Sequence, residues 1–190
     1  MNSAKVASNQ IKQKHKDVKI YLIDSKNASY AEGFLVEETL ELSKKGLSGA
    51  EIASKLENLV KNIYSFLYIP TLKYLYRGGR VSITKYLAAR LLRKKVIIKT
   101  AEDGSLQPVG AIGSVKEGLD KIANLVTNNG NRMPRKIAIV YASNHSLRHQ
   151  AVDYIKKYMP EKTEIRVIQT RAAITAHVGP SAIAIVADFG

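Results

Sequence analysis

The hydrophobic pattern at the start of the chain predicts a helix, a strand and a second helix. Residues 18–24 (VKIYLID) form a compact apolar run that is typical of a buried strand, and residues 1–15 before it favour a helix. A polar turn follows at 26–29, and a periodic segment then extends to Lys45, where Gly46 is a natural helix stop. This order predicts a βα unit.

The next predicted helix carries its own start signal. The Ser48 hydroxyl can accept a hydrogen bond from the amide of Glu51, and the Glu51 carboxylate can reach back to the amide of Ser48, as in a capping box. Apolar residues then recur at helical spacing and mark a buried stripe. They are Ile52, Leu56, Leu59, Val60 and Ile63.

A change of pattern near Ser65 predicts a domain boundary. A short strand-like run, FLYI, is closed there by Pro70. We expect residues 1–64 to form a partial first lobe and residues 65–190 to form a second lobe. The predicted fold class is α/β in two lobes with two sheets: an N-terminal partial parallel-sheet α/β lobe and a C-terminal α/β lobe with a mixed sheet.

The second lobe shows further helix and strand signals. Its expected elements are a short helix at 71–76 broken by Gly78-Gly79, a helix from Ser82 through Leu91, a strand at 94–99, a hairpin turn at Asp103-Gly104, a helix from Ser114 with Glu117 at capping-box spacing, a stop at 128–131, a strand at 136–142, a helix at 147–158, a strand at 163–168, and two short apolar runs at 172–177 and 182–189.

The formal net charge of +14 over 190 residues favours encounters with anionic partners. Part of this charge is concentrated in a stretch that contains no Asp or Glu, and such a stretch is either a solvated surface or an anion-binding patch. Its basic residues are Arg77, Arg80, Lys85, Arg90, Arg93, Lys94, Lys95 and Lys99.

The chain has no cysteine, which excludes disulfides, thiolate nucleophiles and cysteine zinc sites and favours a cytoplasmic location. Neither an export signal nor a membrane span is expected, because no window approaches the roughly eighteen apolar residues that a spanning helix needs. A histidine pair at His145 and His149 with Asp153 has helical spacing, but a surface helix explains it better than a metal site. No nucleophile elbow and no Gly-rich phosphate loop is present.

Three short segments carry candidate chemistry. In the first, Gly78 and Gly79 allow close backbone approach, and Arg80 offers a planar charged group to a carboxylate or phosphate, with Ser82 nearby. The same residues also fit a helix stop followed by a surface arginine.

The second segment runs from His177 through Gly179, Pro180 and Ser181. It is expected to expose a titratable ring where an apolar strand enters a tight turn, although the histidine could simply hydrogen-bond the turn. The third is Asp24-Ser25, at the carboxyl end of the first predicted strand, where ligands bind in open α/β sheets and where polar residues also cap helices.

In chain order, several motifs together resemble the DegV family of bacterial fatty-acid-binding proteins. They are the IDS at 23–25, the sequence GLSGAEI at 46–52, TLKYLYRGGRVS at 71–82, Lys99, the Asp-Gly hairpin, and HVGP at 177–180. The resemblance covers essentially the whole chain. It implies two α/β lobes with a long-chain fatty acid between them and, in several members, service as the acyl-carrying subunit of a separate ATP-binding fatty-acid kinase.

Carried over motif by motif, the resemblance places Arg80 and His177 near the carboxylate of the ligand. Gly78, Gly79, Ser82, Gly179, Pro180, Ser181, Asp24 and Ser25 are possible supporting residues. A guanidinium and an imidazole N–H suit this role, because a buried carboxylate needs charge-assisted donors.

The chain also departs from the family pattern. Family chains usually begin upstream, with a Ser-Gly-Thr segment just before Asn2, so only part of the first lobe is expected here. Thr100 stands where the family has a proline, Ser181 where it has a glycine, and Gly113 where it has an arginine that could contact the kinase.

The leading hypothesis is a non-catalytic carrier of a long-chain fatty acid, with no cofactor and no metal. One alternative is a nucleic-acid-binding protein that uses the basic stretch between Arg77 and Lys99, but no helix-turn-helix or RNA-binding signature supports it. Another is a degenerate family member that acts as an interaction module.

Overall fold

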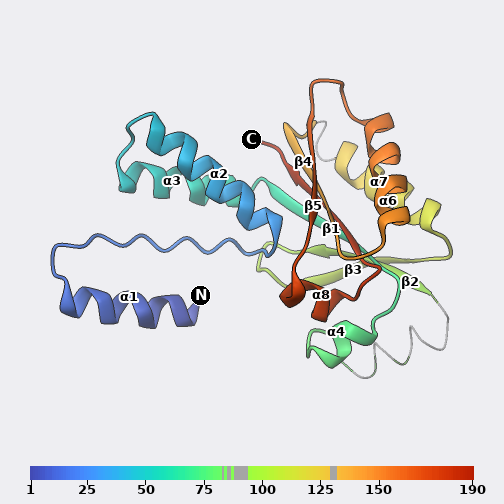
Figure 1. Ribbon diagram of the computed structural model, residues 1–190, viewed down its shortest axis with the longest axis horizontal. Coiled ribbons are helices and arrows are strands. Elements are labelled where there is room, and N and C mark those ends of the chain that lie inside the picture. The colour runs from blue at the N-terminus through green and yellow to red at the C-terminus, as the bar shows by residue number, and fades with distance from the viewer. Residues whose placement is uncertain (83, 85–86, 88–93, 129–131) are drawn as a thin grey trace.

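The computed structural model describes residues 1–82, 84, 87, 94–128 and 132–190 (Figure 1). Its helices are α1 (Asn2–Lys14), α2 (Tyr30–Lys44), α3 (Gly49–Val60), α4 (Lys73–Arg77), α6 (Val115–Thr127), α7 (His145–Tyr158) and α8 (Ala172–Val178). The strands are β1 (Ile63–Ile69), β2 (Lys95–Thr100), β3 (Leu106–Ile112), β4 (Lys136–Tyr141), β5 (Glu164–Gln169) and β6 (Ile183–Asp188).

All six described strands join one sheet in the order β3-β2-β1-β6-β4-β5. Strands β4 and β5 pair in parallel and every other neighbouring pair is antiparallel, so the sheet is mixed. The predicted α/β class with a mixed sheet is confirmed. The expectation of two sheets is wrong for the described residues, because β1 hydrogen-bonds both β2 and β6 and so places the early and late strands in the same sheet.

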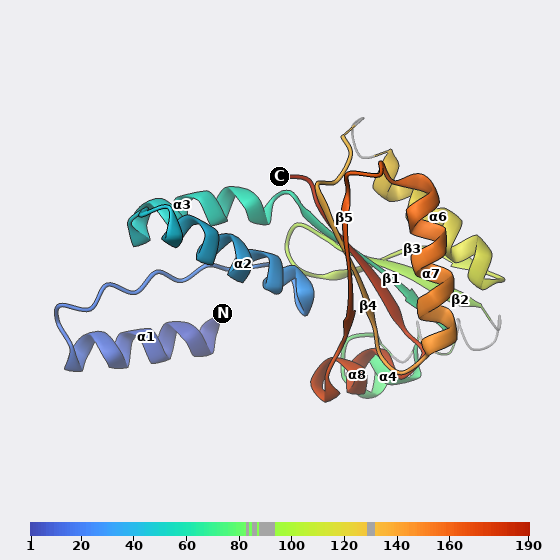
Figure 2. The same ribbon diagram turned by 45° about the horizontal axis from the view of Figure 1, so that its top comes forward.

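One face of the sheet is covered by α6 and α7 (Figure 2). Successive side chains of a strand point to opposite faces, and the buried residues of alternate positions, such as Phe66, Tyr68, Ile183 and Ile185, pack beneath these two helices. Among the residues that the structure describes, this cluster is the largest of three apolar clusters. It therefore supplies much of the hydrophobic stabilisation of the sheet.

The opposite face is covered at its two ends by different helix pairs. Helices α2 and α3 pack at one end on Ala138, Val140 and Val186. Helices α4 and α8 lie at the other end, where Leu72 and Leu75 form a third cluster with strand residues. The middle of this face lies between the two helix pairs.

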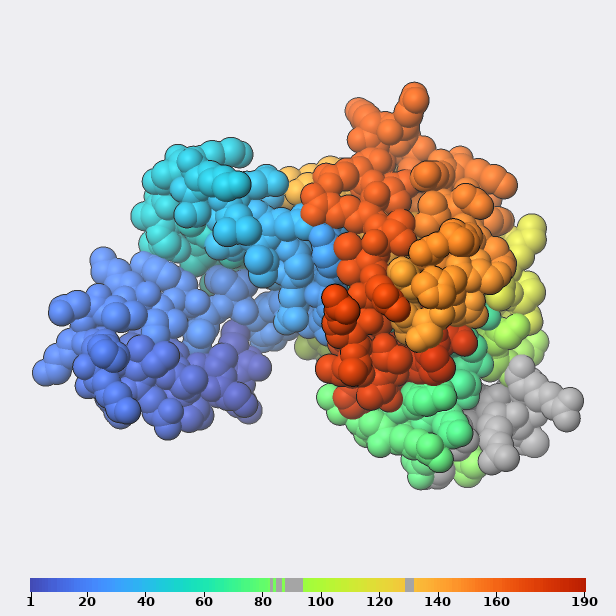
Figure 3. Space-filling model, viewed as in Figure 1, coloured from blue at the N-terminus to red at the C-terminus, as the bar shows by residue number. Residues whose placement is uncertain are grey.

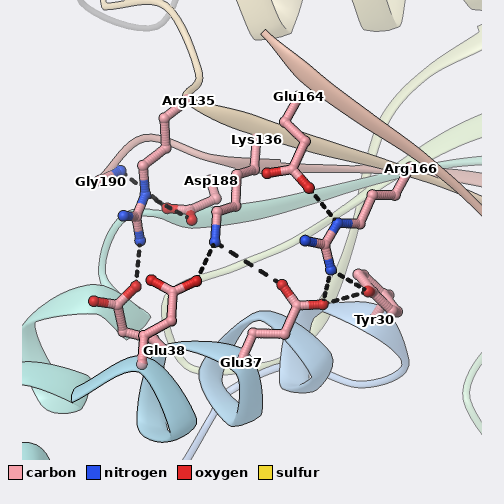
Figure 4. Close-up of polar contacts among 10 residues, drawn as sticks. Tyr30, Glu37, Glu38, Arg135, Lys136, Glu164, Arg166, Asp188 and Gly190 are labelled. Carbon is pink, nitrogen blue, oxygen red and sulfur yellow. Dashed lines mark hydrogen bonds and ion pairs between the residues drawn. The ribbon is translucent and has the colours of Figure 1, made fainter. Parts of the chain in front are cut away.

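Ion pairs attach α2 to the end of the sheet (Figure 4). Arg135 pairs with Glu38 of α2 and with the fully buried Asp188, each at 2.9 Å. Arg166 of β5 pairs with Glu37, and both contact the hydroxyl of Tyr30. The N-terminal part of α2, from Tyr30 to Glu38, is thereby attached to the sheet.

The strand expected at residues 18–24 is wrong. This segment is extended but pairs with no described strand, and residues 1–62 contain helices and irregular structure only. Its apolar side chains Val18, Tyr21 and Leu22 are exposed, at 45%, 45% and 36%. Figure 3 shows residues 1–60 gathered on one side of the molecule, and the apolar run pairs with no strand of the described sheet.

Most local predictions are confirmed. Ser48 and Glu51 form the capping box at the start of α3, and Gly46 takes the left-handed conformation after α2. At α6, Ser114 caps the helix, but the Glu117 carboxylate accepts from the amide of Gly113 instead of Ser114. Most of the helix predicted from Ser82 through Leu91 and most of the stop at 128–131 lie outside the described residues. So do three of the eight basic residues of the basic stretch, Lys85, Arg90 and Arg93.

The boundary predicted between residues 64 and 65 stays a prediction. Residue 64 lies within β1, and the apolar cluster beneath α2 and α3 includes side chains from β4 and β6.

Candidate functional site

A cavity of about 280 Å³ lies on the sheet face between the two helix pairs. This volume is close to the lower end of the range of roughly 300–1,000 Å³ for small-molecule sites. The lining is mostly apolar, and its apolar side chains come from β1, β3, β4, β6, α4 and α8. They include Leu67, Leu75, Leu106, Val140, Ile174, Val178, Ala184 and Val186.

Arg80 lines this cavity just after α4 ends. The amide of Arg80 donates to the carbonyl of Leu75 at 2.8 Å, and the amide of Gly79 donates to the carbonyl of Tyr76 at 3.0 Å. With Gly79 at a φ of 72°, these bonds form the Schellman motif that ends many helices. The Arg80 guanidinium also donates to the carbonyl of Gly78 at 2.7 Å, so the helix stop and the cavity-lining arginine both follow from the same Gly-Gly-Arg sequence.

His177 lines the same cavity from the last turn of α8. The expectation that it sits at a strand end is wrong, because residues 172–178 close helical hydrogen bonds, including one from the amide of Gly179 to the carbonyl of Thr175 at 2.8 Å. Its Nδ1 atom is buried and has no hydrogen-bond partner among the described residues. The ring is therefore held by packing.

Two glycines allow α4 and α8 to approach closely. A Cβ atom on Gly78 would lie 2.2 Å from Nδ1 of His177, and one on Gly179 would lie 2.5 Å from the Tyr74 ring. Each helix thus presents a glycine to an aromatic or imidazole ring of the other. This contact brings Arg80 and His177 to one end of the cavity.

The other predicted site residues do not line the cavity. Gly78, Gly79, Gly179, Pro180 and Ser181 belong to the two turns that position Arg80 and His177, and Ser82 follows the first of these turns. Asp24 forms an ion pair with Lys26 at 2.7 Å, and Ser25 hydrogen-bonds Glu32 at 3.1 Å. Whether any of these residues contacts a ligand stays a prediction.

A polar cluster that sequence reasoning missed lines the other end of the cavity. The side chains of Ser65 on β1 and Thr100 on β2 both donate to Oδ1 of Asn27, at 2.8 and 3.5 Å. Asn27 belongs to the turn that precedes α2. The sequence does show the polar turn at 26–29. Which residue of this turn faces the sheet depends on contacts with residues 38 and 73 positions away in sequence.

The cavity lining contains two basic groups, Arg80 and His177, and no Asp or Glu among the described residues. Such a site favours an anion at one end and an apolar group over the sheet. Elsewhere, no cluster of side chains suited to hold a metal ion occurs among the described residues. In the same part of the chain, every helix is too short or too polar to cross a bilayer.

Comparison with known proteins assigns the chain to a family. The model for uncharacterised proteins of the DegV family matches residues 1–189. The chain belongs to the DegV family. A DegV domain-containing protein of Staphylococcus aureus is 31% identical over 174 residues, covering 90% of this chain and 61% of that protein. A DegV domain-containing protein of Clostridium perfringens is 27% identical over 179 residues, covering 94% of this chain and 63% of that protein.

Two solved structures share the fold of this DegV chain. A DegV family protein from Eubacterium eligens, loaded with heptadecanoic acid, superposes with a TM-score of 0.90 at 23% identity, covering 100% of this chain and 68% of that one. The Streptococcus pneumoniae fatty acid kinase (Fak) B3 protein, loaded with linoleic acid, superposes with a TM-score of 0.90 at 21% identity. The match covers 100% of this chain and 66% of that one. The expected α/β fold of the family is thus confirmed.

This DegV chain spans about three-fifths of the length of the curated relatives it matches.

Proposed function

We propose that this chain binds a long-chain fatty acid in the cavity without catalysing its conversion. The carboxylate lies near Arg80 and His177, and the acyl tail lies over the sheet. One observation carries the proposal: two basic side chains and an apolar floor line the same cavity, and no acidic side chain opposes them among the described residues.

The two parts of such a ligand have different requirements. A carboxylate removed from water needs charge-assisted hydrogen bonds, which the Arg80 guanidinium and the His177 imidazole can donate. The tail gains about 0.8 kcal/mol for each methylene that it buries. Leu67, Ala184 and Val186 offer it an apolar surface.

Solved relatives give independent support. The Eubacterium eligens protein holds heptadecanoic acid and the Streptococcus pneumoniae protein holds linoleic acid, and both superpose on the whole chain. By analogy with the second protein, the chain would present its acyl group to a separate ATP-binding fatty-acid kinase in the cytoplasm. Gly113 stands in the region where an arginine of the family could contact that kinase.

The binding proposal is tested by native mass spectrometry and organic extraction of the purified chain. We expect a fatty acid at near one-to-one ratio. Arg80→Gln should weaken the affinity about 10- to 100-fold, because it removes a hydrogen bond to a charged group. Arg77→Gln is the matched control, since Arg77 is a basic side chain three residues away that does not line the cavity. Repeated recovery of protein without lipid would overturn the proposal.

The carrier role is tested by mixing the chain, a fatty acid, ATP and a fatty-acid kinase subunit. Acyl phosphate should form only when all four are present, and the chain with ATP alone should form none. Loss of lipid binding together with capture of a protein partner would favour the interaction module. Salt-sensitive binding of DNA or RNA would favour the nucleic-acid alternative.

A further inference from the structure

The cavity has polar side chains at both ends of its sheet floor. The register of β1 and β6 places Ser65 opposite Val186 and Tyr68 opposite Ile183. Ala182, just before β6, follows the turn that leaves α8 and so marks the end with Arg80 and His177. Val186 and Ala182 are four residues apart along one chain, about 13 Å at roughly 3.3 Å per residue.

The polar cluster at the far end has hydrogen-bonding capacity left over. Oδ1 of Asn27 accepts from the Ser65 hydroxyl at 2.8 Å, from the Thr100 hydroxyl at 3.5 Å and from the amide of Ala28 at 3.1 Å. The amide N–H can only donate, so it identifies the atom that it contacts as the oxygen. The NH₂ group of Asn27 is then the other end of the side chain.

Among the described residues, nothing donates to the oxygen of Ser65 or Thr100, and nothing accepts from the NH₂ group of Asn27. Ser65 is only 4% exposed. A fully apolar acyl tail over this cluster would leave the NH₂ group of Asn27 and the acceptor sites of the two hydroxyl oxygens without partners in a desolvated site, which disfavours its binding. One hydroxyl on the tail can donate to a Ser65 or Thr100 oxygen and accept from Asn27.

We infer that the cavity selects a long-chain fatty acid that carries a hydroxyl partway along its tail, with the hydroxyl bound by Asn27, Ser65 and Thr100. This inference rests on the proposed function and names the ligand class within it. Arg80 and His177 hold the carboxylate, and the polar cluster binds a second polar group of the ligand at a fixed distance along the sheet. The distance makes the selection depend on the position of the hydroxyl.

The test is competition between octadecanoic acid and a series of its monohydroxy derivatives, measured by native mass spectrometry on the full chain. The derivative with the hydroxyl at the matching mid-chain carbon should bind roughly five- to tenfold more tightly than octadecanoic acid. Derivatives with the hydroxyl near either end should show no such preference. If every derivative binds as well as or less well than octadecanoic acid, the inference is wrong.

A double variant, Ser65→Ala with Thr100→Val, should abolish the preference, so that the mid-chain derivative and octadecanoic acid compete equally. Thr127→Val is the control, because the Thr127 hydroxyl bonds the carbonyl of Ala123 within α6, on the other face of the sheet. A preference that persists in the double variant would overturn the inference. Failure of octadecanoic acid itself to bind the unaltered chain would instead overturn the proposed function, and the inference with it.

Discussion

Single glycines decide how closely α4 and α8 approach each other. Gly78→Ala places a Cβ atom 2.2 Å from Nδ1 of His177, so the histidine ring or the helix must move. Overpacking of this kind costs about 1–3 kcal/mol of unfolding free energy. We expect that loss in urea unfolding, together with weaker fatty-acid binding, because the displaced ring belongs to the cavity wall.

Gly113→Ala is the matched control for this prediction. Its added Cβ atom would meet only the Glu117 carboxylate, at 3.4 Å, which is an ordinary contact. It should leave stability and lipid affinity nearly unchanged. Equal effects of the two substitutions would contradict the assignment of Gly78 to the α4–α8 contact.

The capping box of α3 makes a second prediction at the residue scale. The hydroxyl and the amide of Ser48 both donate to the Glu51 carboxylate, at 2.6 and 2.9 Å, and these bonds hold the pKa of Glu51 below its usual value. Because the folded-state pKa is lowered, the stabilisation is complete above the usual pKa of Glu and is lost as the pH falls through the folded-state pKa.

Ser48→Ala should therefore raise the pKa of Glu51 toward its usual value and lower the urea midpoint at neutral pH. Titration of the Glu51 side chain by NMR measures the first effect. Ser54→Ala, an exposed change on the same helix, should leave the titration of Glu51 unchanged. An unaltered Glu51 midpoint in the Ser48 variant would rule out this account of the cap.

At the scale of elements, the attachment of α2 controls one wall of the cavity. Asn27, Ala28 and Ser29 line the cavity directly before α2 begins, and Glu37 holds the helix to Arg166. The two side chains are 22% and 34% exposed, intermediate between a surface pair and a buried one. Glu37→Gln should therefore cost roughly 1–3 kcal/mol of unfolding free energy.

The loss should appear in urea unfolding, and lipid affinity should fall as well, because the turn at 27–29 loses its support. Lys116→Gln is a suitable control, since it breaks the exposed i,i+4 pair with Asp120. Such pairs contribute only about 0.3–0.5 kcal/mol. A Glu37 variant as mild as the Lys116 variant would show that apolar packing alone holds α2 in place.

Some helices and turns of the fold can be predicted from the local sequence, and others cannot. Capping residues, glycine stops and the Asp-Gly hairpin act over a few positions, so α3, the end of α2 and the β2–β3 turn were predictable. The helix α8 was not, because seven residues rich in alanine fit either a short helix or a strand. In the fold, this helix packs against α4, a contact far away in sequence.

The residues of the candidate site were likewise predictable only in part. Arg80 and His177 were found because each stands in a short motif with a recognisable turn, and the structure places both in one cavity. The polar cluster of Asn27, Ser65 and Thr100 was missed because its members come from three separate segments. Only the pairing of β1 with β2, which sets Phe66 opposite Lys99, brings Ser65 near Thr100.

At the scale of the whole molecule, residues 18–24 show how an apolar pattern can mislead. A run of this kind becomes a strand only where a neighbouring strand accepts and donates its backbone hydrogen bonds. In this chain the amides of residues 19–25 donate to no described residue. The segment instead connects α1 to α2 along one side of the molecule (Figure 1).

Hydrogen exchange measured by mass spectrometry distinguishes the two states of this segment. Amides 19–25 should exchange at nearly the rate of an unstructured peptide, because no intramolecular hydrogen bond must open first. The amides of β6, which pairs with β1 and β4, should exchange only when the sheet unfolds. Protection of residues 19–25 comparable to that of β6 would mean that the segment pairs as a strand, through a second copy of the chain or another partner.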